Sequence, residues 1–142
     1  MAHVAVQPSA SAPLDVERSQ TIHRYFDAIA GGATEELEAI LMPETVTRWP
    51  QTGERITSAS SCIRVHTNYP GGPPSHEIVR ISGGGDVWTA ELVADYGEDR
   101  WHIVSLIRFR GQRISEVTDY FGPTLPAPEW RRGLVDPVVG RT

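Results

Sequence analysis

The chain has 142 residues, of which 39% are apolar and 22% are charged, and its formal net charge is −5. This length is typical of one globular domain that buries its own core, and the single cysteine, Cys62, excludes an internal disulfide and a cysteine-based zinc site. The acidic balance argues against a sequence-independent grip on nucleic acid, so we expect no nucleic-acid partner.

The N-terminal segment, residues 1–13, is rich in Ala, Ser and Pro and has no periodicity, which predicts a disordered tail. It lacks the basic start and the long apolar stretch of a signal peptide. No segment approaches the ~20 continuous apolar residues that a membrane span requires. The simplest expectation is a cytoplasmic protein that does not contact a membrane.

Two helices are predicted next. Asp15 is expected to cap the first, which ends at the glycine pair 31–32. The apolar residues of this segment recur at helical spacing: Val16, Ile22, Tyr25, Phe26 and Ile29. Thr34 is expected to cap a short second helix, which we expect Pro43 to end.

The rest of the chain alternates between one more helix and β-rich segments. "ETVTRWP" predicts a strand, and after a turn around Gly53 a third helix is expected from about Ser58 to Asn68. Four β-rich segments follow: "SHEIVRIS", "DVWTAELVADYG", "RWHIVSLIRFR" and "QRISEVTDYFG". "GGGD", "GEDR" and a tight hairpin at Gly111 separate them. This order predicts an α+β domain with helices on one face of a curved sheet.

The element order resembles the SnoaL-like branch of the nuclear transport factor 2-like (NTF2-like) superfamily. The resemblance covers most of the chain and is carried by "RYFDAIAGGATEELEAIL", "RWPQTGERI", "VSLIRFRGQRISEVTDYF" and "APEWR". It implies a cone-shaped curved antiparallel sheet packed on three N-terminal helices and enclosing an apolar pocket. It places the domain at residues 14–131, followed by an irregular C-terminal tail, residues 132–142, with Trp130 as the residue expected to fix the tail. It also implies a homodimer, and Trp88, Val104 and Leu106 are expected on the outer, pairing face.

Side chains alternate along a strand, so one face of each strand must line the pocket. In the last two strands the expected inner sets are Trp101, Ile103, Ser105, Ile107 and Phe109, and Val117, Asp119 and Phe121. In the segment 87–96 the choice stays open between the set containing Glu91 and the set containing Trp88.

The resemblance also suggests roles for single residues. "TDYF" is similar to the segment that supplies an acidic catalytic residue in limonene epoxide hydrolase and in SnoaL, which implies that Asp119 faces the pocket. The arginine and aspartate of the hydrolase fall at Glu91 and Val93, so that triad is incomplete. Tyr25 matches the oxyanion-hole tyrosine of ketosteroid isomerase, but the general base of that enzyme falls near Trp49 and is missing.

Each candidate has a structural alternative. Asp119 is a general acid or base, or else a carboxylate paired with Arg48 or Arg24. Glu91 forms a carboxylate pair with Asp119, or else faces solvent or pairs with Arg108. Tyr25 holds a ligand oxygen or only packs, and His66 transfers protons or is a surface residue. The expected substrate-binding residues are Trp49, Tyr69, Trp101, Ser105 and Phe121. We expect no metal and no cofactor, because the histidines lack metal-ligand spacing.

These candidates predict a protein that binds a small apolar, oxygenated molecule and performs cofactor-free acid–base chemistry on it, of the cyclase, isomerase or dehydratase type. The alternative is a non-catalytic binding or carrier protein on the same scaffold. A third possibility is a structural dimer module that presents the outer sheet face to a partner, and it alone would survive if side chains filled the cavity.

Overall fold

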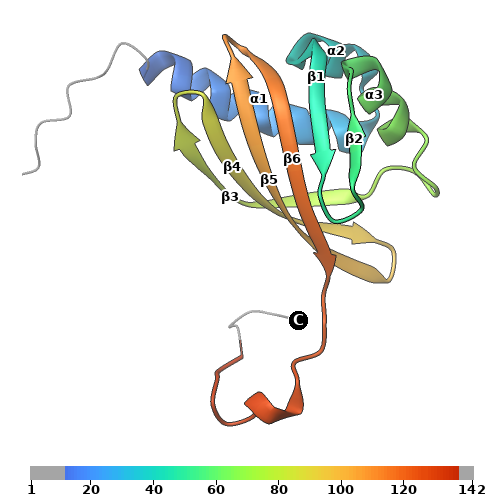
Figure 1. The fold of residues 1–142 in the computed structure, drawn as a ribbon, viewed down its shortest axis with the longest axis vertical. Coiled ribbons are helices and arrows are strands. Elements are labelled where there is room, and N and C mark those ends of the chain that lie inside the picture. The colour runs from blue at the N-terminus through green and yellow to red at the C-terminus, as the bar shows by residue number, and fades with distance from the viewer. Residues whose placement is uncertain (1–11, 138–142) are drawn as a thin grey trace, which may run out of the picture.

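The computed structural model describes residues 12–137, which form three α-helices, a six-stranded sheet and a short 3-10 helix (Figure 1). The elements are α1 (Ala12–Gly31), α2 (Thr34–Ile40), β1 (Leu41–Trp49), β2 (Glu54–Ile56), α3 (Ala59–Thr67), β3 (Ser75–Gly84), β4 (Val87–Tyr96), β5 (Asp99–Arg110), β6 (Arg113–Pro123) and η1 (Glu129–Arg131). No helix in this range is long and apolar enough to cross a membrane. The predicted α+β class is confirmed.

The strand order in the sheet is β2-β1-β6-β5-β4-β3. The sheet curves around the helices and does not close into a barrel (Figure 1). Four of its strand pairs are antiparallel, which agrees with the expected curved antiparallel sheet, but β1 and β6 run parallel, so the sheet is mixed. Strand β2 was missed, because only three of its residues pair with β1.

The helices differ from the sequence prediction mainly at their ends. Helix α1 begins at Ala12, inside the segment expected as a tail, while residues 1–11 lie outside the described residues. Thr34 is the first residue of α2 and not its cap, and Pro43 lies inside β1 instead of ending a helix. The register of β1 against β6 shifts between Leu41 and Val46, which is where a strand tolerates proline. Helix α3 is as predicted, with Ser58 accepting a hydrogen bond from the Ser61 N–H at 3.0 Å.

The core lies between the helices and the inner face of the sheet. Ile22 of α1, Ile107 of β5, and Ile114 and Val117 of β6 are almost completely buried. Trp88 also belongs to this core and is only 6% exposed, so its assignment to the outer pairing face is wrong. The β4 side chains therefore alternate with Trp88, Ala90, Leu92 and Ala94 inside.

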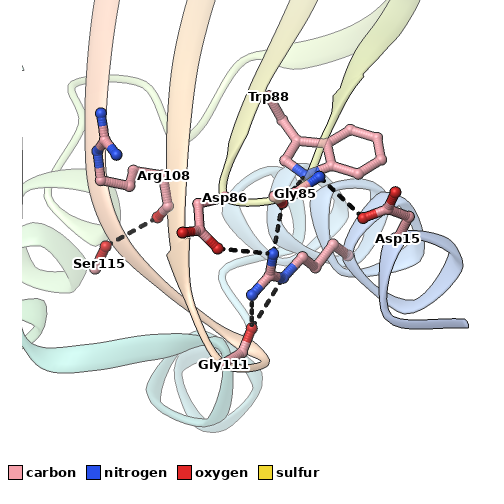
Figure 2. A network of polar contacts seen from close by, with 8 residues as sticks. Asp15, Gly85, Asp86, Trp88, Arg108, Gly111 and Ser115 are labelled. Carbon is pink, nitrogen blue, oxygen red and sulfur yellow. Dashed lines mark hydrogen bonds and ion pairs between the residues drawn. The ribbon is translucent and has the colours of Figure 1, made fainter. Parts of the chain in front are cut away.

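A buried arginine, Arg18, holds one end of α1 against two hairpin turns of the sheet. Arg18 of α1 donates two hydrogen bonds to the Gly111 carbonyl oxygen, at 2.9 and 2.8 Å, and one to the Gly85 carbonyl oxygen. It also pairs with Asp86 at 3.0 Å. Asp15, expected as a helix cap, instead accepts a hydrogen bond from the Gly85 N–H. Figure 2 shows how the two hairpin turns, with Gly85 and Gly111, converge on this helix.

The C-terminal segment leaves the sheet after β6 and lies apart from the domain (Figure 1). Trp130 is 71% exposed and contacts the Arg131 guanidinium, so it does not fix the segment to the domain. Residues 132–137 are irregular, with one isolated bridge between Arg132 and Val135. Residues 138–142 of the expected tail lie outside the described residues.

Candidate functional site

A cavity of about 580 Å³ lies between α1, the end of α3 and the inner face of the sheet. It occupies the half of the sheet away from the hairpin turns that Arg18 holds. The strand register places Ser105 of β5 beside Asp119 of β6 at its wall. Its volume is in the range of small-molecule sites. Side chains therefore do not fill this cavity, so a structural dimer module is not the one possibility left.

Asp119 is partly buried and lines this cavity, and each of its carboxylate oxygens accepts one hydrogen bond. The Trp49 Nε1–H donates to Oδ2 at 2.9 Å, and the Ser105 hydroxyl donates to Oδ1 at 2.6 Å. Burial raises the pKa of Asp119, and the two hydrogen bonds oppose this rise. The alternative of an arginine pair is wrong, because Arg48 pairs with Glu116 at 2.8 Å and Arg24 pairs with Glu36.

Glu91 does not lie at the cavity. Its side chain is on the outer face of β4, where it pairs with Arg80 of β3 at 2.6 Å. A carboxylate pair with Asp119 is therefore wrong. Glu91 lies on the outer face with an ion pair, as the structural alternative expected, but its partner is Arg80 of β3 and not Arg108. The alternating set that contains Trp88 is wholly apolar and is the buried one, so the alternation itself favours an outward Glu91.

Tyr25 lies on the inner face of α1 and lines the cavity, with 2% of its surface exposed. Burial raises the pKa of Tyr25 well above its ordinary value, and the nearby Cys62 and Asp119 raise it further. The phenol is therefore a neutral hydrogen-bond donor. Cys62 itself is buried outside the cavity lining, and burial raises the pKa of its thiol to about 11, so it is not a nucleophile at neutral pH.

Two histidines line the cavity, and only one was a predicted site residue. His66, at the end of α3, has a pKa lowered to about 4 by burial and by His76. His76, at the start of β3, has a pKa lowered by burial. The buried Nε2 of His66 and Nδ1 of His76 have no hydrogen-bond partner among residues 12–137. His76 could have been found from its alternation with Ile78, which also faces inward.

Five aromatic side chains that line the cavity contact one another in succession and form a wall, here called the ring wall: Tyr69, Tyr96, Trp101, Phe121 and Trp49. Neighbouring ring centroids lie 5.3 Å apart for Tyr69 and Tyr96, 5.9 Å for Tyr96 and Trp101, 6.1 Å for Trp101 and Phe121, and 6.3 Å for Phe121 and Trp49. All five predicted substrate-binding residues line the cavity, and the structure adds Tyr96. Their contact with a ligand, like the absence of a metal and a cofactor, stays a prediction.

The two residues with a formal charge among the described cavity lining are both acidic. Asp119 lies at its wall, and Glu54 is an exposed residue of β2. None of the lining residues within the described part of the chain is an arginine or a lysine. The cavity is thus an apolar, aromatic site with a buried carboxylate, a phenol donor and two neutral imidazoles.

No protein-family model matches the sequence, and a search of curated proteins finds no match. Solved structures do match. An NTF2-like protein of unknown function from Burkholderia xenovorans is 27% identical, with a TM-score of 0.77, over 87% of this chain and 96% of that one. A protein from Kribbella flavida, provisionally described as a ketosteroid isomerase, is also 27% identical, with a TM-score of 0.79, over 87% of this chain and 91% of that one.

A SnoaL-like protein from Jannaschia, provisionally described as a polyketide cyclase, is 12% identical, with a TM-score of 0.68, over 77% of this chain and 88% of that one. At that identity the likeness shows the fold alone. The resemblance read from the sequence is thus confirmed in the fold.

Proposed function

Starting from this NTF2-like fold, we propose that the chain binds a small apolar, oxygenated molecule in the cavity and catalyses cofactor-free proton transfer on it. The reaction is of the cyclase, isomerase or dehydratase type. The general kind is that of the neighbours described as an isomerase and a cyclase. The observation that carries the proposal is the carboxylate of Asp119, which lines the cavity partly buried and accepts hydrogen bonds at both oxygens from Trp49 and Ser105.

The chemistry assigned to each residue follows from its protonation. Asp119 exchanges the proton, because burial brings its pKa closer to neutrality, where proton transfer is most efficient. Tyr25 donates a hydrogen bond to a substrate oxygen on which negative charge develops. His66 and His76 are neutral and offer ring nitrogens to further polar groups of the substrate.

The second candidate is a binding or carrier protein without chemistry. The outward position of Glu91 favours it, because it leaves Asp119 as the one carboxylate at the buried wall of the described cavity. The two candidates differ in whether a bound molecule is converted.

The deciding experiment starts from the ligand retained by protein prepared from its own host, identified by native mass spectrometry. Turnover of that ligand is then compared between the wild type, Asp119→Asn and the control Glu116→Gln, which changes a carboxylate on the outer face of the same strand. General acid–base catalysis predicts that Asp119→Asn lowers kcat by about 10²- to 10⁴-fold, with Glu116→Gln unchanged. Conversion at an unchanged rate in Asp119→Asn would refute the catalytic role, and binding without conversion by the wild type would establish the carrier.

We further propose that two copies pair through the outer face of the sheet. Val104, Leu106 and Tyr120 are exposed there, and Val104 lies opposite Tyr120 in the strand register. An apolar patch of this kind marks an association surface. A cytoplasmic location stays a prediction.

A further inference from the structure

The partly buried carboxylate of Asp119 has no positively charged partner among the described residues. Its two hydrogen bonds come from an indole and a hydroxyl, both neutral. The arginines nearest along the sheet pair elsewhere, since Arg48 and Arg108 both pair with Glu116. Neutral hydrogen bonds compensate a desolvated carboxylate less than a cation does, and no cation comes from the described residues. The counter-charge can therefore come from a ligand.

The ring wall of the cavity is suited to the same kind of ligand. Tyr69, Tyr96, Trp101, Phe121 and Trp49 follow one another with centroids 5.3 to 6.3 Å apart, and the last of them donates to Asp119. The faces of such rings carry partial negative charge and attract ammonium groups, most strongly when water is excluded.

The remaining polar groups do not oppose a cation. His66 and His76 are uncharged at neutral pH, because burial lowers the pKa of each. Glu54 adds a second negative charge among the lining residues. An anionic ligand would therefore meet a carboxylate and no arginine at the described lining.

We propose that the ligand of this cavity is an organic cation, an apolar molecule carrying a protonated amine or a quaternary ammonium group. The cationic nitrogen lies against the ring wall within the field of Asp119, and a substrate oxygen faces Tyr25. This inference rests on the proposed function in one respect, namely that Asp119 faces the ligand. It narrows the substrate class and disfavours carboxylates and phosphate esters.

Three probes of similar size separate charge from shape. Benzyltrimethylammonium is the cation, neopentylbenzene is its neutral isostere, and 3-phenylpropanoate is an anion. Binding is measured from the ¹H–¹⁵N signals of the tryptophan indoles at pH 7.5, because Trp49 and Trp101 lie at the cavity. We expect the cation to bind at least tenfold tighter than the isostere and the anion not to bind.

Two variants and one control test the cause of the preference for a cation. Asp119→Asn should weaken cation binding at least tenfold and leave the isostere unchanged, and Glu116→Gln should change neither. Trp101→Leu, which keeps apolar volume but removes a ring face, should weaken the cation more than the isostere. A neutral probe that binds as tightly as the cation, a cation that does not bind, or an Asp119→Asn variant with unchanged cation affinity would overturn the inference. The proposed function is judged separately, by turnover of the retained ligand, and survives if the isostere binds as well as the cation.

Discussion

The indole nitrogen of Trp49 lies 2.9 Å from Oδ2 of Asp119, although the two residues are 70 positions apart in the chain. The parallel pairing of β1 with β6 makes this contact possible, because it places the end of β1 beside the second half of β6. Trp49 is therefore both a cavity ring and a support for the carboxylate.

Trp49→Phe should raise the pKa of Asp119. The substitution keeps an aromatic ring but removes a donor that favours the ionised carboxylate, so burial acts with less opposition. The titration of the Asp119 carboxyl carbon by ¹³C NMR measures the change. Trp101→Phe is the control, because the hydrogen bonds to Asp119 come from Trp49 and Ser105. An unchanged or lower pKa in Trp49→Phe would contradict this account.

His66 should make the stability of the protein depend on pH. Its pKa falls from 6.5 to about 4 on folding, so between these values the unfolded chain binds a proton that the folded chain does not. The free energy of unfolding should therefore rise as pH increases from 4 to 6.5, by about 3 kcal/mol from this residue. Its contribution is lost as pH falls through that window.

Urea unfolding at pH 4 and pH 7 measures this effect. In His66→Gln the pH dependence should be smaller than in the wild type by that amount, while His23→Gln, at an exposed position of α1, should leave the wild-type profile unchanged. Comparing variants also removes the opposite contribution of Asp119. Equal pH profiles for His66→Gln and the wild type would show that the imidazole titrates normally in the folded state.

The strands differ in how clearly their sequences mark the inner face. In β5 and β6 the more apolar alternating set is the inner one, which places Ser105 and Phe121 at the cavity. In β4 the set containing Trp88 is wholly apolar and is the buried one, so alternation favours an outward Glu91, and the hydrolase resemblance alone suggested Glu91 for the cavity. The parallel β1–β6 pairing joins distant segments and leaves no local signature. His76 was missed because it was considered only as a metal ligand, although its alternation with Ile78 indicates the inner face.

Gly83→Ala should destabilise the fold by about 1–3 kcal/mol. Gly83 has a φ of +145°, and a Cβ there would lie 2.7 Å from both the Trp88 Cα and the Val87 carbonyl oxygen. Gly84→Ala is a matched control, because its Cβ would meet only Asp15 at 3.6 Å. Thermal and urea unfolding measure both. Equal losses at the two positions would contradict the steric explanation.

Arg18→Met should cost several times more stability than Arg24→Met. Arg18 is 4% exposed, donates to the Gly85 and Gly111 carbonyls and pairs with Asp86, so its loss leaves several buried polar groups without this partner and should cost about 3 kcal/mol. The Arg24–Glu36 pair is half-exposed, and its loss should cost less than about 1 kcal/mol. Chemical denaturation tests this, and similar losses in both variants would show that the buried network contributes little.

Leu106→Glu should convert a dimer into a monomer. Leu106 lies on the outer sheet face and is 41% exposed, so a charge there would be buried without a partner in a dimer. Sedimentation velocity should give the wild type twice the 15.6 kDa mass of one chain and the variant that mass alone. Leu125→Glu, in the exposed C-terminal segment, should stay dimeric. A monomeric wild type would refute the proposed pairing.

The position of Arg18 has a consequence for how this molecule can diversify. Its bonds brace one end of α1 against both hairpins, whereas the hollow sits beyond the other half of that helix. Replacements among the rings near the opening therefore leave the brace intact. Substitutions at these rings, in evolution or by design, can therefore change which small molecule binds while the rest of the fold stays rigid.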